Sequence, residues 1–210
     1  MATTKLSSDV AFTPAVKAVQ TRLGSRATYA RMEARGGWAT ELDDEVAAFI
    51  GAQTSAFLAT ASADGQPYIQ HRGGPAGFLR VLDPRTIAFA DFRGNRQYIS
   101  VGNLAENAKV HLFLIDYVHQ QRIKIWGTAS IVESDPALLA RLADPAYAGK
   151  PERAIVIDVA AWDANCPQHI PHRLEAADVT AALASRDRRI AELEAALRSR
   201  ATRGSESGSP

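Results

Sequence analysis

The sequence predicts a mainly β protein with flanking helices, an α+β fold, and three observations support this prediction. Short apolar runs separated by turn signals fill the centre of the chain, from Thr54 to Trp162. Apolar residues recur at helical spacing before this region, in residues 13–52, and again after it, from Leu174. Closely spaced short strands are typical of an antiparallel barrel or sandwich, whereas parallel sheets alternate strands with helices.

The composition is that of an ordinary globular protein. The 210 residues are 46% hydrophobic and 22% charged, which is enough to bury a substantial core. The formal net charge is +1, from 24 Lys and Arg residues against 23 Asp and Glu residues. This balance provides no general attraction for nucleic acid or for an anionic membrane surface, so we expect neither partner.

Three features predict a cytoplasmic protein. No apolar run approaches the roughly 20 residues that a helix needs to cross a bilayer. The first residues, MATTKLSSDVAFTP, lack the basic segment and apolar run of a secretory signal. The single cysteine, Cys166, cannot form an internal disulfide, which agrees with a reducing compartment.

Residues 1–53 are expected to form an N-terminal helical segment that packs on the strands. Pro14 suits a first helical turn, and apolar residues follow it at helical spacing. Thr40 is a candidate N-cap for a later helix. One face of that helix carries the apolar residues Leu42, Val46, Phe49 and Ile50.

Residues 54–173 contain the predicted strands and the candidate ligand sites. Turn signals such as Asp64-Gly65, Asp83-Pro84 and Arg93-Gly94-Asn95 separate the first strands, and a short helix is expected near Asp135 to Leu142. The apolar runs are, in order, SAFLATAS, PYIQH, GFLRVL, TIAFADF, KVHLFLID, RIKIWGTASIVE and ERAIVIDVAAW.

Residues 174–201 are expected to form a C-terminal amphipathic helix. Leu183, Ile190 and Leu197 are seven residues apart, and Leu193 lies between the last two. Arg186 interrupts this narrow apolar seam, so both a dimeric coiled coil and packing on the strands of the same or a partner subunit stay open. Residues 202–210, a polar Gly/Ser tail, are expected to be disordered.

The first candidate site is the glycine-rich segment QHRGGPAGF, residues 70–78. Gly73 and Gly74 leave the backbone without side-chain cover, so a flat ligand can lie against main-chain N–H and C=O groups. Arg72, beside them, suits an anionic group. The alternative is an ordinary glycine-rich hairpin loop, which the residues alone do not exclude.

The second candidate site is the turn in DFRGNRQYISVGNLAEN, residues 91–107, which leads into a helix expected from about Ile99. The free N–H groups and the dipole at a helix start favour a phosphate. Guanidinium, amide and hydroxyl donors suit the same anion. A solvated arginine turn is the alternative. The donors in this turn are Arg93, Asn95, Arg96, Gln97 and Ser100.

The third candidate site is NCPQHIPHR, in which Cys166, His169 and His172 recur every third residue. This donor set suits zinc. However, Pro167 and Pro171 exclude a regular helix, so the spacing does not align the side chains, and we expect no metal. The alternatives are a structural turn and a segment that faces a cofactor or substrate, in which Cys166 is a small buried residue.

Taken in order, the segments FLATASADGQPYIQHRGGPAGFL, TIAFADFRGNRQYISVGNLAENAKVHLFLID, QRIKIWGTASIVE and NCPQHIPHR resemble one known family. It is the pyridoxamine 5′-phosphate oxidase-like family of FMN-binding split barrels, in particular its flavin-nucleotide-binding branch. The resemblance implies a six-stranded antiparallel split β-barrel. It also implies a homodimer with FMN at the subunit interface.

The resemblance further implies the contacts to FMN. The family's phosphate turn falls at Asn95, Arg96 and Gln97, where Gln97 replaces a lysine. The flavin-lining strand begins at Arg72 and ends at Gly77, which also replaces a lysine. The other positions that the family places on the flavin are Gly73, Gly74, Pro75, Ala76, Asp91, Phe92, Arg122, which replaces a glutamine, and Gln168, in the segment that returns to the cofactor cleft.

These inferences predict an FMN-binding flavoprotein, expected to be an FMN-dependent oxidoreductase that acts on a small organic substrate or a reduced nicotinamide. His169, His172 and Arg173 are the catalytic candidates. The alternatives are a non-catalytic flavin-binding or sensing protein, a deazaflavin-binding protein, and a haem-handling protein with His169 or His172 as the iron ligand.

Overall fold

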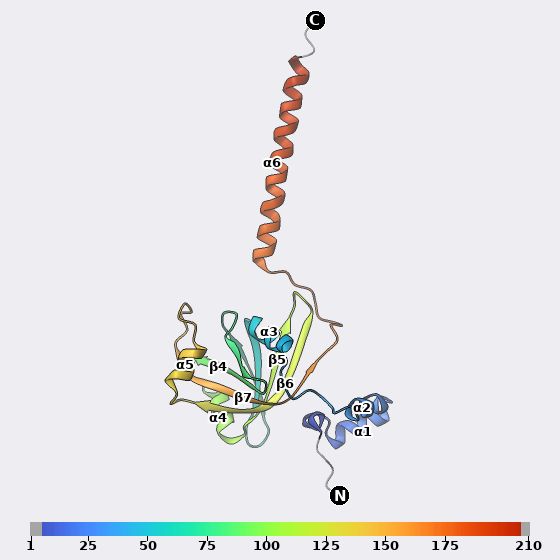
Figure 1. The fold of residues 1–210 in the computed structure, drawn as a ribbon, viewed down its shortest axis with the longest axis vertical. Coiled ribbons are helices and arrows are strands. Elements are labelled where there is room, and N and C mark those ends of the chain that lie inside the picture. Colours follow the sequence, from blue (N-terminus) through green and yellow to red (C-terminus); the bar gives the residue numbers. More distant parts are fainter. Residues whose placement is uncertain (1–5, 207–210) are drawn as a thin grey trace. The chain divides into compact units, whose positions relative to one another are not determined.

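The computed structural model describes residues 6–206 of the chain. Within these residues, seven strands form one antiparallel sheet in the order β2-β1-β5-β6-β7-β4-β3 (Figure 1). Each apolar run of the sequence forms one strand. The strands are β1 (Ser55–Ala61), β2 (Pro67–Gly73), β3 (Leu79–Asp83), β4 (Thr86–Phe92), β5 (Lys109–Asp116), β6 (Gln121–Val132) and β7 (Pro151–Ala164).

The described sheet has seven strands, not the six that the family resemblance implies. The additional strand is explained by pairing at one edge. The short run of β3 pairs with β4 across the tight turn at Pro84 and Arg85, and β4 pairs on its other side with β7. β7 in turn pairs with β6, so a single long strand joins the two halves of the sheet.

The helices largely follow the sequence pattern, with one correction at an N-cap. Pro14 lies in the first turn of α1, as predicted. The cap of α3 is Asp43, whose Oδ1 accepts a hydrogen bond from Val46 N at 2.8 Å, and the prediction of Thr40 is wrong. The reason is that Leu42 N donates to Pro84 O at 2.6 Å, which holds the chain before Asp43 outside the helix. The helices are η1 (Ser7–Val10), α1 (Pro14–Arg22), α2 (Arg26–Glu33), α3 (Asp44–Ala52), α4 (Ile99–Glu106), α5 (Pro136–Leu142) and α6 (Ala176–Glu206).

The chain divides into two compact units. The first contains the sheet and helices α1 to α5, and the second contains the turn Tyr117–Gln120 together with the chain from His169 onward, including α6. Helix α6 continues to Glu206, so residues 202–206 of the expected disordered tail are helical. The rest of that tail, 207–210, lies outside the described residues.

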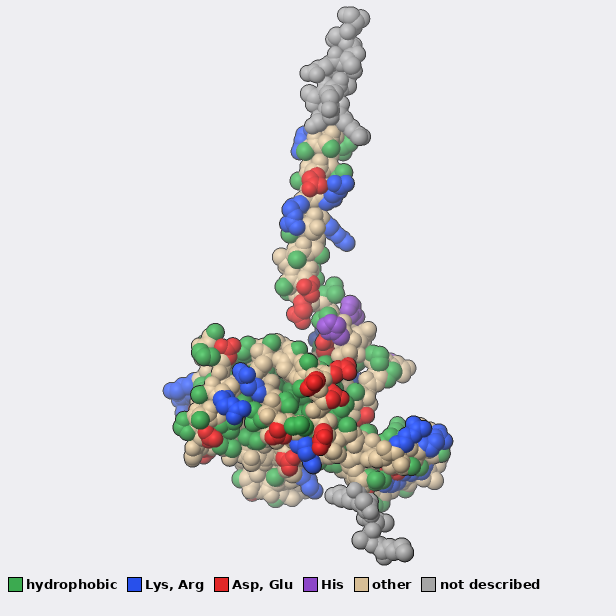
Figure 2. Space-filling model, in the orientation of Figure 1, with side chains coloured by type: hydrophobic (Ala, Val, Ile, Leu, Met, Phe, Trp, Pro, Cys, Tyr) green, Lys and Arg blue, Asp and Glu red, His purple; other side chains and the backbone are tan. Residues whose placement is uncertain are grey.

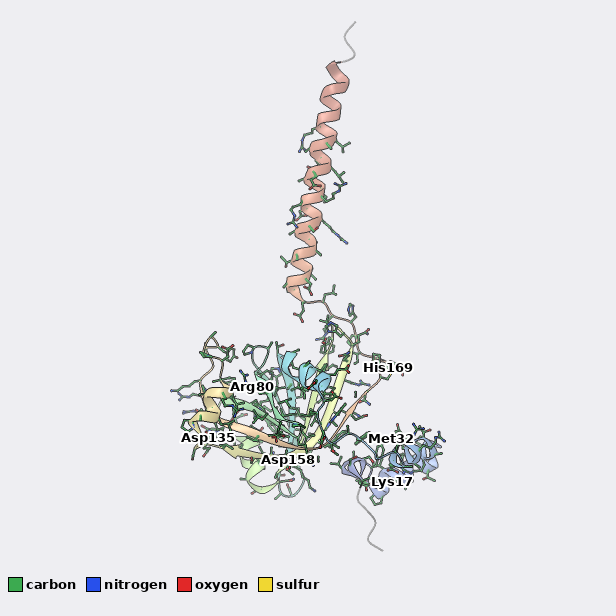
Figure 3. All side chains as sticks on the ribbon, viewed as in Figure 1. Lys17, Met32, Arg80, Asp135, Asp158 and His169 are labelled. Atoms are coloured by element: carbon green, nitrogen blue, oxygen red, sulfur yellow. The ribbon has the colours of Figure 1, made fainter. Side chains whose placement is uncertain are left out.

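One main hydrophobic core lies within the first unit. Val46 and Ile50 on the predicted apolar face of α3 are buried in it, together with Leu42, which precedes the helix. The same cluster includes side chains from β1 and from β3 to β7. Neighbouring strands are about 4.8 Å apart, so strands distant in the sheet share a core only if the sheet curls around it. In Figure 3, Asp158 marks the middle of β7 and Asp135 the N-cap of α5.

The surface carries both charges. Acidic and basic side chains are interspersed on the face shown in Figure 2, in agreement with the nearly balanced net charge. Among the described helices, none combines the length and the apolar character that crossing a membrane requires.

Candidate functional site

A polar cleft lies where β2, β4, the turn before α4 and the start of β7 come together. Its volume is about 50 Å³. Pairing of β4 with β7 places Asp91 opposite Arg153, which brings the start of β7 to residues far away in sequence. The cleft is lined by Gln70, Arg72, Asp91, Phe92, Gly94, Asn95, Arg96, Tyr98, Ser100, Val101 and Glu152.

Two nearly buried arginines share one carboxylate at this cleft. Arg72 Nη1 donates to Asp91 Oδ1, and the two side chains are 11% and 12% exposed. Arg153, also 11% exposed, lies with its Nε 3.9 Å from Asp91 Oδ2. The Nε atoms of Arg72 and Arg153 are buried and have no hydrogen-bond partner. Of the two arginines, Arg72 lines the cleft. Because buried N–H groups are normally satisfied, its guanidinium is suited to an anion that enters the cleft.

The turn before α4 has an unusual backbone. Arg96 and Tyr98 have φ values of 58° and 53°, in the left-handed region that residues other than glycine rarely adopt. Asn95 stabilises the turn, because its Oδ1 accepts a hydrogen bond from Gln97 N at 3.2 Å. Helix α4 then begins at Ile99, as predicted, without a side-chain cap. Strained backbone of this kind is concentrated at functional sites, and the uncapped N–H groups favour an anion.

The arginines of this turn are exposed and loosely paired. Arg93 and Arg96 are 45% and 52% exposed, and each approaches Glu152 Oε1, at 3.7 and 3.8 Å. Exposed pairs at such distances contribute little stability. Both guanidinium groups are therefore able to turn toward a bound phosphate at small energetic cost.

Two residues that line the cleft, Gln70 and Glu152, were not among the site residues expected from the sequence. Ser100 Oγ donates to Gln70 Oε1 at 2.8 Å and ties the first turn of the helix to β2. Gln70 precedes Arg72 by two residues, so the period of the strand alone would place both on one face. Glu152 carried no such signal, because only the pairing of β4 with β7 brings it to the cleft.

Part of the predicted cofactor set is brought together in the cleft: Arg72, Asp91, Phe92, Asn95 and Arg96 line it, and Gln97 lies in the same turn. The loop from Gly73 to Gly77 does not line the cleft. Gly74 N donates to Thr54 O at 3.2 Å and Gly77 N donates to Gly51 O at 2.6 Å. A Cβ at Gly74 would lie 2.6 Å from Phe78 Cβ, so close packing within the chain accounts for this glycine.

Arg122 and Gln168 do not line the cleft either. Arg122 lies at the start of β6, where its guanidinium donates to Cys166 O at 3.5 Å. Lys124, two residues further along β6, pairs with Asp163 near the end of β7. Glu152, which lines the cleft, lies near the start of the same strand. At about 3.3 Å per residue, the two places are roughly 35 Å apart along the strand.

The Cys-His segment is held as a turn in the second unit. His169 has a φ of 67°, Gln120 Nε2 donates to Ile170 O at 2.6 Å, and Arg173 N donates to Tyr117 O at 3.2 Å. The Arg173 guanidinium also lies 3.9 Å from the ring centroid of Tyr117. No group of three or more His, Cys, Asp or Glu residues in residues 6–206 is placed to hold a metal ion.

Cys166 itself lies at the end of the first unit, and the expectation that it is buried is wrong. The residue is exposed, because it follows the last residue of β7 in a loop that leaves the sheet. The recurrence of Cys166, His169 and His172 in the sequence therefore has no counterpart in a shared side-chain cluster among the described residues.

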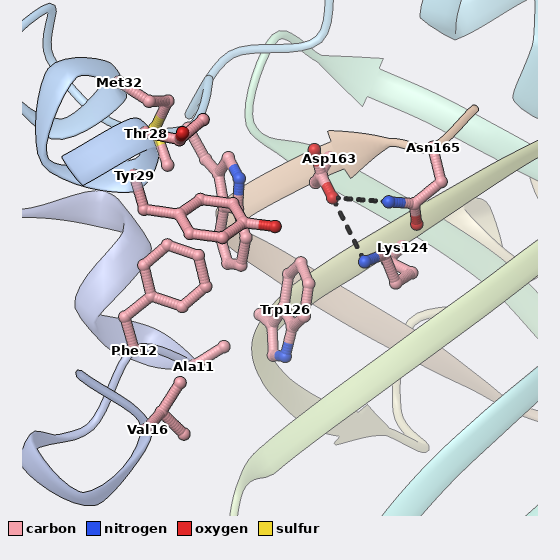
Figure 4. A pocket seen from close by; sticks show the side chains of 11 residues that line it. Ala11, Phe12, Val16, Thr28, Tyr29, Met32, Lys124, Trp126, Asp163 and Asn165 are labelled. Carbon is pink, nitrogen blue, oxygen red and sulfur yellow. Dashed lines mark hydrogen bonds and ion pairs between the residues drawn. The ribbon is translucent and has the colours of Figure 1, made fainter. Parts of the chain in front are cut away.

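A second, larger pocket lies between the N-terminal helices and the sheet (Figure 4). Its volume is about 510 Å³. Trp38 stacks on Trp126 with ring centroids 4.6 Å apart, and Lys124 pairs with Asp163 at 3.1 Å at the polar end. The sequence analysis missed this pocket, because its residues are spread over distant segments. They are Ala11, Phe12, Val16, Thr28, Tyr29, Met32, Trp38, Lys124, Trp126, Asp163 and Asn165.

His111 lies beside this aromatic cluster and is expected to make stability depend on pH. Its ring centroid is 4.9 Å from that of Trp126. Burial lowers the pKa of His111 below its ordinary value of 6.5, and the charge of Lys124 lowers it further. The unfolded chain therefore binds a proton at a higher pH than the folded protein, so stability is lost as pH falls below about 6.5.

We expect urea unfolding to show this loss between about pH 7.5 and 5.5, and to show less of it in His111→Gln. The variant keeps a polar side chain but removes the titrating ring. Equal pH dependence in the two proteins would contradict the assignment.

Comparison with known proteins gives a match over more than half of the chain. A family model described as pyridoxamine 5′-phosphate oxidase matches residues 42–166. No curated protein matches the chain in sequence.

Among solved structures, HupZ of Group A Streptococcus is 22% identical, with a TM-score of 0.49, over 63% of this chain and 98% of that one. An FMN-binding protein of Syntrophomonas wolfei is 14% identical, with a TM-score of 0.46, over 70% and 97%. A Clostridium acetobutylicum protein related to general stress protein 26, of the pyridoxinephosphate oxidase family, is 15% identical, with a TM-score of 0.42, over 56% and 82%. At these identities and TM-scores the structures add no argument about activity.

Proposed function

Because the chain belongs to the pyridoxamine 5′-phosphate oxidase family, we propose that it binds FMN and acts as an FMN-dependent oxidoreductase. The observation that carries this proposal is the cleft between β2, β4 and α4, in which arginine donors surround an uncapped helix start. A phosphate monoester carries nearly two negative charges, which this donor set suits. FMN supplies the redox chemistry when it is bound.

Arg96 is the residue that we assign to the phosphate. It is exposed, it lies in the strained turn, and its partner Glu152 is 3.8 Å away. Arg72, which is held by Asp91, lines the same cleft. Asn95 and Ser100 also line the cleft.

We further propose that the cofactor lies between two subunits of a homodimer. A cleft of about 50 Å³ is far smaller than the roughly 300–1,000 Å³ of sites that enclose a cofactor. The flavin ring therefore needs another surface to cover it. A surface for a partner is available on β1 and β2, where Phe57 and Ile69 are 36% and 64% exposed.

Substitution of Arg96 tests the phosphate assignment. We expect Arg96→Ala to raise the Kd for FMN about 10- to 100-fold in a flavin fluorescence titration, because a charge-assisted hydrogen-bonding group contributes about 1.5–3 kcal/mol. The matched control is Arg80→Ala, which removes an exposed arginine from β3 outside the cleft (Figure 3) and should leave the Kd unchanged. An unchanged Kd in Arg96→Ala would show that the phosphate binds elsewhere.

The visible spectrum tests the chemistry. Protein reconstituted with FMN is expected to show a flavin band near ~450 nm that bleaches with a reduced nicotinamide or an organic donor and recovers with an electron acceptor. Bound flavin without any such turnover would support a non-catalytic flavin protein. A Soret band after purification would support haem, and preference for a deazaflavin over FMN would replace the cofactor assignment.

A further inference from the structure

Helix α6 exposes a regular stripe of large apolar side chains. The helix spans Ala176–Glu206, and aliphatic side chains alternate with charged ones along it (Figure 2). A soluble helix normally buries such a stripe. The exposed residues of the stripe are Val179 (39%), Leu183 (53%), Ile190 (53%), Leu193 (47%) and Leu197 (65%).

The spacing of this stripe is that of a coiled coil and not that of an ordinary amphipathic helix. From Val179 to Leu197 the steps alternate between four and three residues, with Arg186 at the one position that is not apolar. Leu183, Ile190 and Leu197 then occupy one seam position, and Val179, Arg186 and Leu193 the other. Isoleucine at the first position and leucine at the second, as at Ile190 and Leu193, favours two strands over three or four.

The charges beside the seam select the orientation of the two helices. Asp187 and Glu194 lie on one flank and Arg189 on the other. In a parallel pair, Arg189 faces Glu194 of the partner subunit, so opposite charges meet on both sides. In an antiparallel pair each flank faces its own copy, which brings acidic residues together and Arg189 against Arg189. These side chains are exposed, at 67% for Arg189 and 58% for Glu194.

Arg186 fits the same arrangement at a cost in stability. In a parallel, in-register pair the two Arg186 side chains meet at the same level of the seam. Each enters a hole that Asp187 of the partner subunit borders, so the two carboxylates offset the repulsion between the arginines. A polar residue at a single seam position commonly sets the register of a coiled coil while weakening it.

We propose that α6 forms a parallel, in-register, two-stranded coiled coil with α6 of a second copy of this chain. The partner is therefore identical to the chain itself, and the interaction does not depend on flavin. If the sheets also associate as a homodimer, the tethered helices have a high local concentration, which compensates for the short length of the seam.

Disulfide trapping in the full-length chain tests the orientation. In a Cys166→Ser background, which removes the single native cysteine, Val179→Cys places a thiol on the seam. Mild oxidation is expected to give a covalent dimer for most of the protein, because only a parallel, in-register pair brings the two thiols together. The control is Ser185→Cys, on the opposite side of the helix, and it should cross-link about tenfold more slowly. Equal cross-linking at the two positions, or none at Val179→Cys, would overturn the proposal.

Charge exchange tests the partner surface by a separate route. Glu194→Arg and Arg189→Glu, each added to the trapping background, are expected to lower the trapped fraction about tenfold, because attraction becomes repulsion on both sides of the seam. The double variant restores opposite charges and should restore trapping. Circular dichroism of each variant checks that α6 stays helical. Unchanged trapping in both single variants, or no recovery in the double variant, would refute the charge pairing.

Discussion

Replacing Asp91 with alanine is expected to lower the free energy of unfolding by about 3–5 kcal/mol. Asp91 is the carboxylate that Arg72 and Arg153 share, and both arginines are 11% exposed. Removing it leaves Arg72, a nearly buried positive charge, without its carboxylate, whereas Arg153 keeps Glu152, whose Oε2 accepts a hydrogen bond from its Nη2 at 3.3 Å. A buried unpaired charge is far more costly than a lost surface pair. Urea unfolding followed by far-UV circular dichroism measures the loss.

The matched control is Glu133→Ala, which removes another partner of Arg153. Glu133 Oε1 lies 3.7 Å from Arg153 Nε, but its side chain is 62% exposed, so we expect a change below about 1 kcal/mol. A second variant, Arg72→Met with Asp91→Leu, removes both charges of the pair and should recover part of the loss. If Asp91→Ala is no more destabilising than Glu133→Ala, Asp91 does not have this role.

Replacing Gly127 with alanine is expected to cost about 3 kcal/mol of stability. Gly127 lies in β6 at the irregularity in its pairing with β7. A Cβ at this position would collide with the carbonyl oxygen of Asp158, and would lie 3.1 Å from the Asp158 carbonyl carbon and from Ile157 Cγ2. The obstacle is main chain, so β7 itself has to move. Thermal and urea unfolding should both show the loss.

Gly51→Ala is the control for the glycine effect. Gly51 lies in helix α3, and a Cβ there would meet nothing within 4 Å. Alanine in a helix is favoured over glycine by about 0.5–1 kcal/mol, so this variant should be as stable as the parent protein or more stable. Comparable destabilisation by both substitutions would contradict the steric explanation for Gly127.

Much of the secondary structure was predictable because each element has a local cause. Every apolar run between turn signals forms a strand, and α5, Pro136–Leu142, lies within the helix expected near Asp135 to Leu142. The error at Thr40 arose because a hydrogen bond from Leu42 to Pro84, a contact distant in sequence, delays the start of α3. The seven apolar runs correspond to the seven described strands, but the order of the strands in the sheet depends on which of them pair.

The candidate site was predictable only in part, for the same reason. Arg96 and its turn are local, since a short polar segment leads directly into α4. Strand pairing brings Glu152 to the cleft and Arg153 to Asp91, and one sequence does not reveal such pairing. The glycine-rich segment showed a different difficulty. Its sequence suits a ligand, but Gly74 packs against Phe78 within the chain.

The helices and strands, the cationic turn before α4 and the heptad stripe of α6 can all be predicted locally, because each depends on residues within a few positions of one another. Which segments share a site follows from tertiary contacts instead. Pairing of β4 with β7 placed Arg153 opposite Asp91, and docking of the N-terminal helices placed Trp38 against Trp126. Such contacts depend on the register and order of strands, which are properties of the whole sheet and not of any one segment.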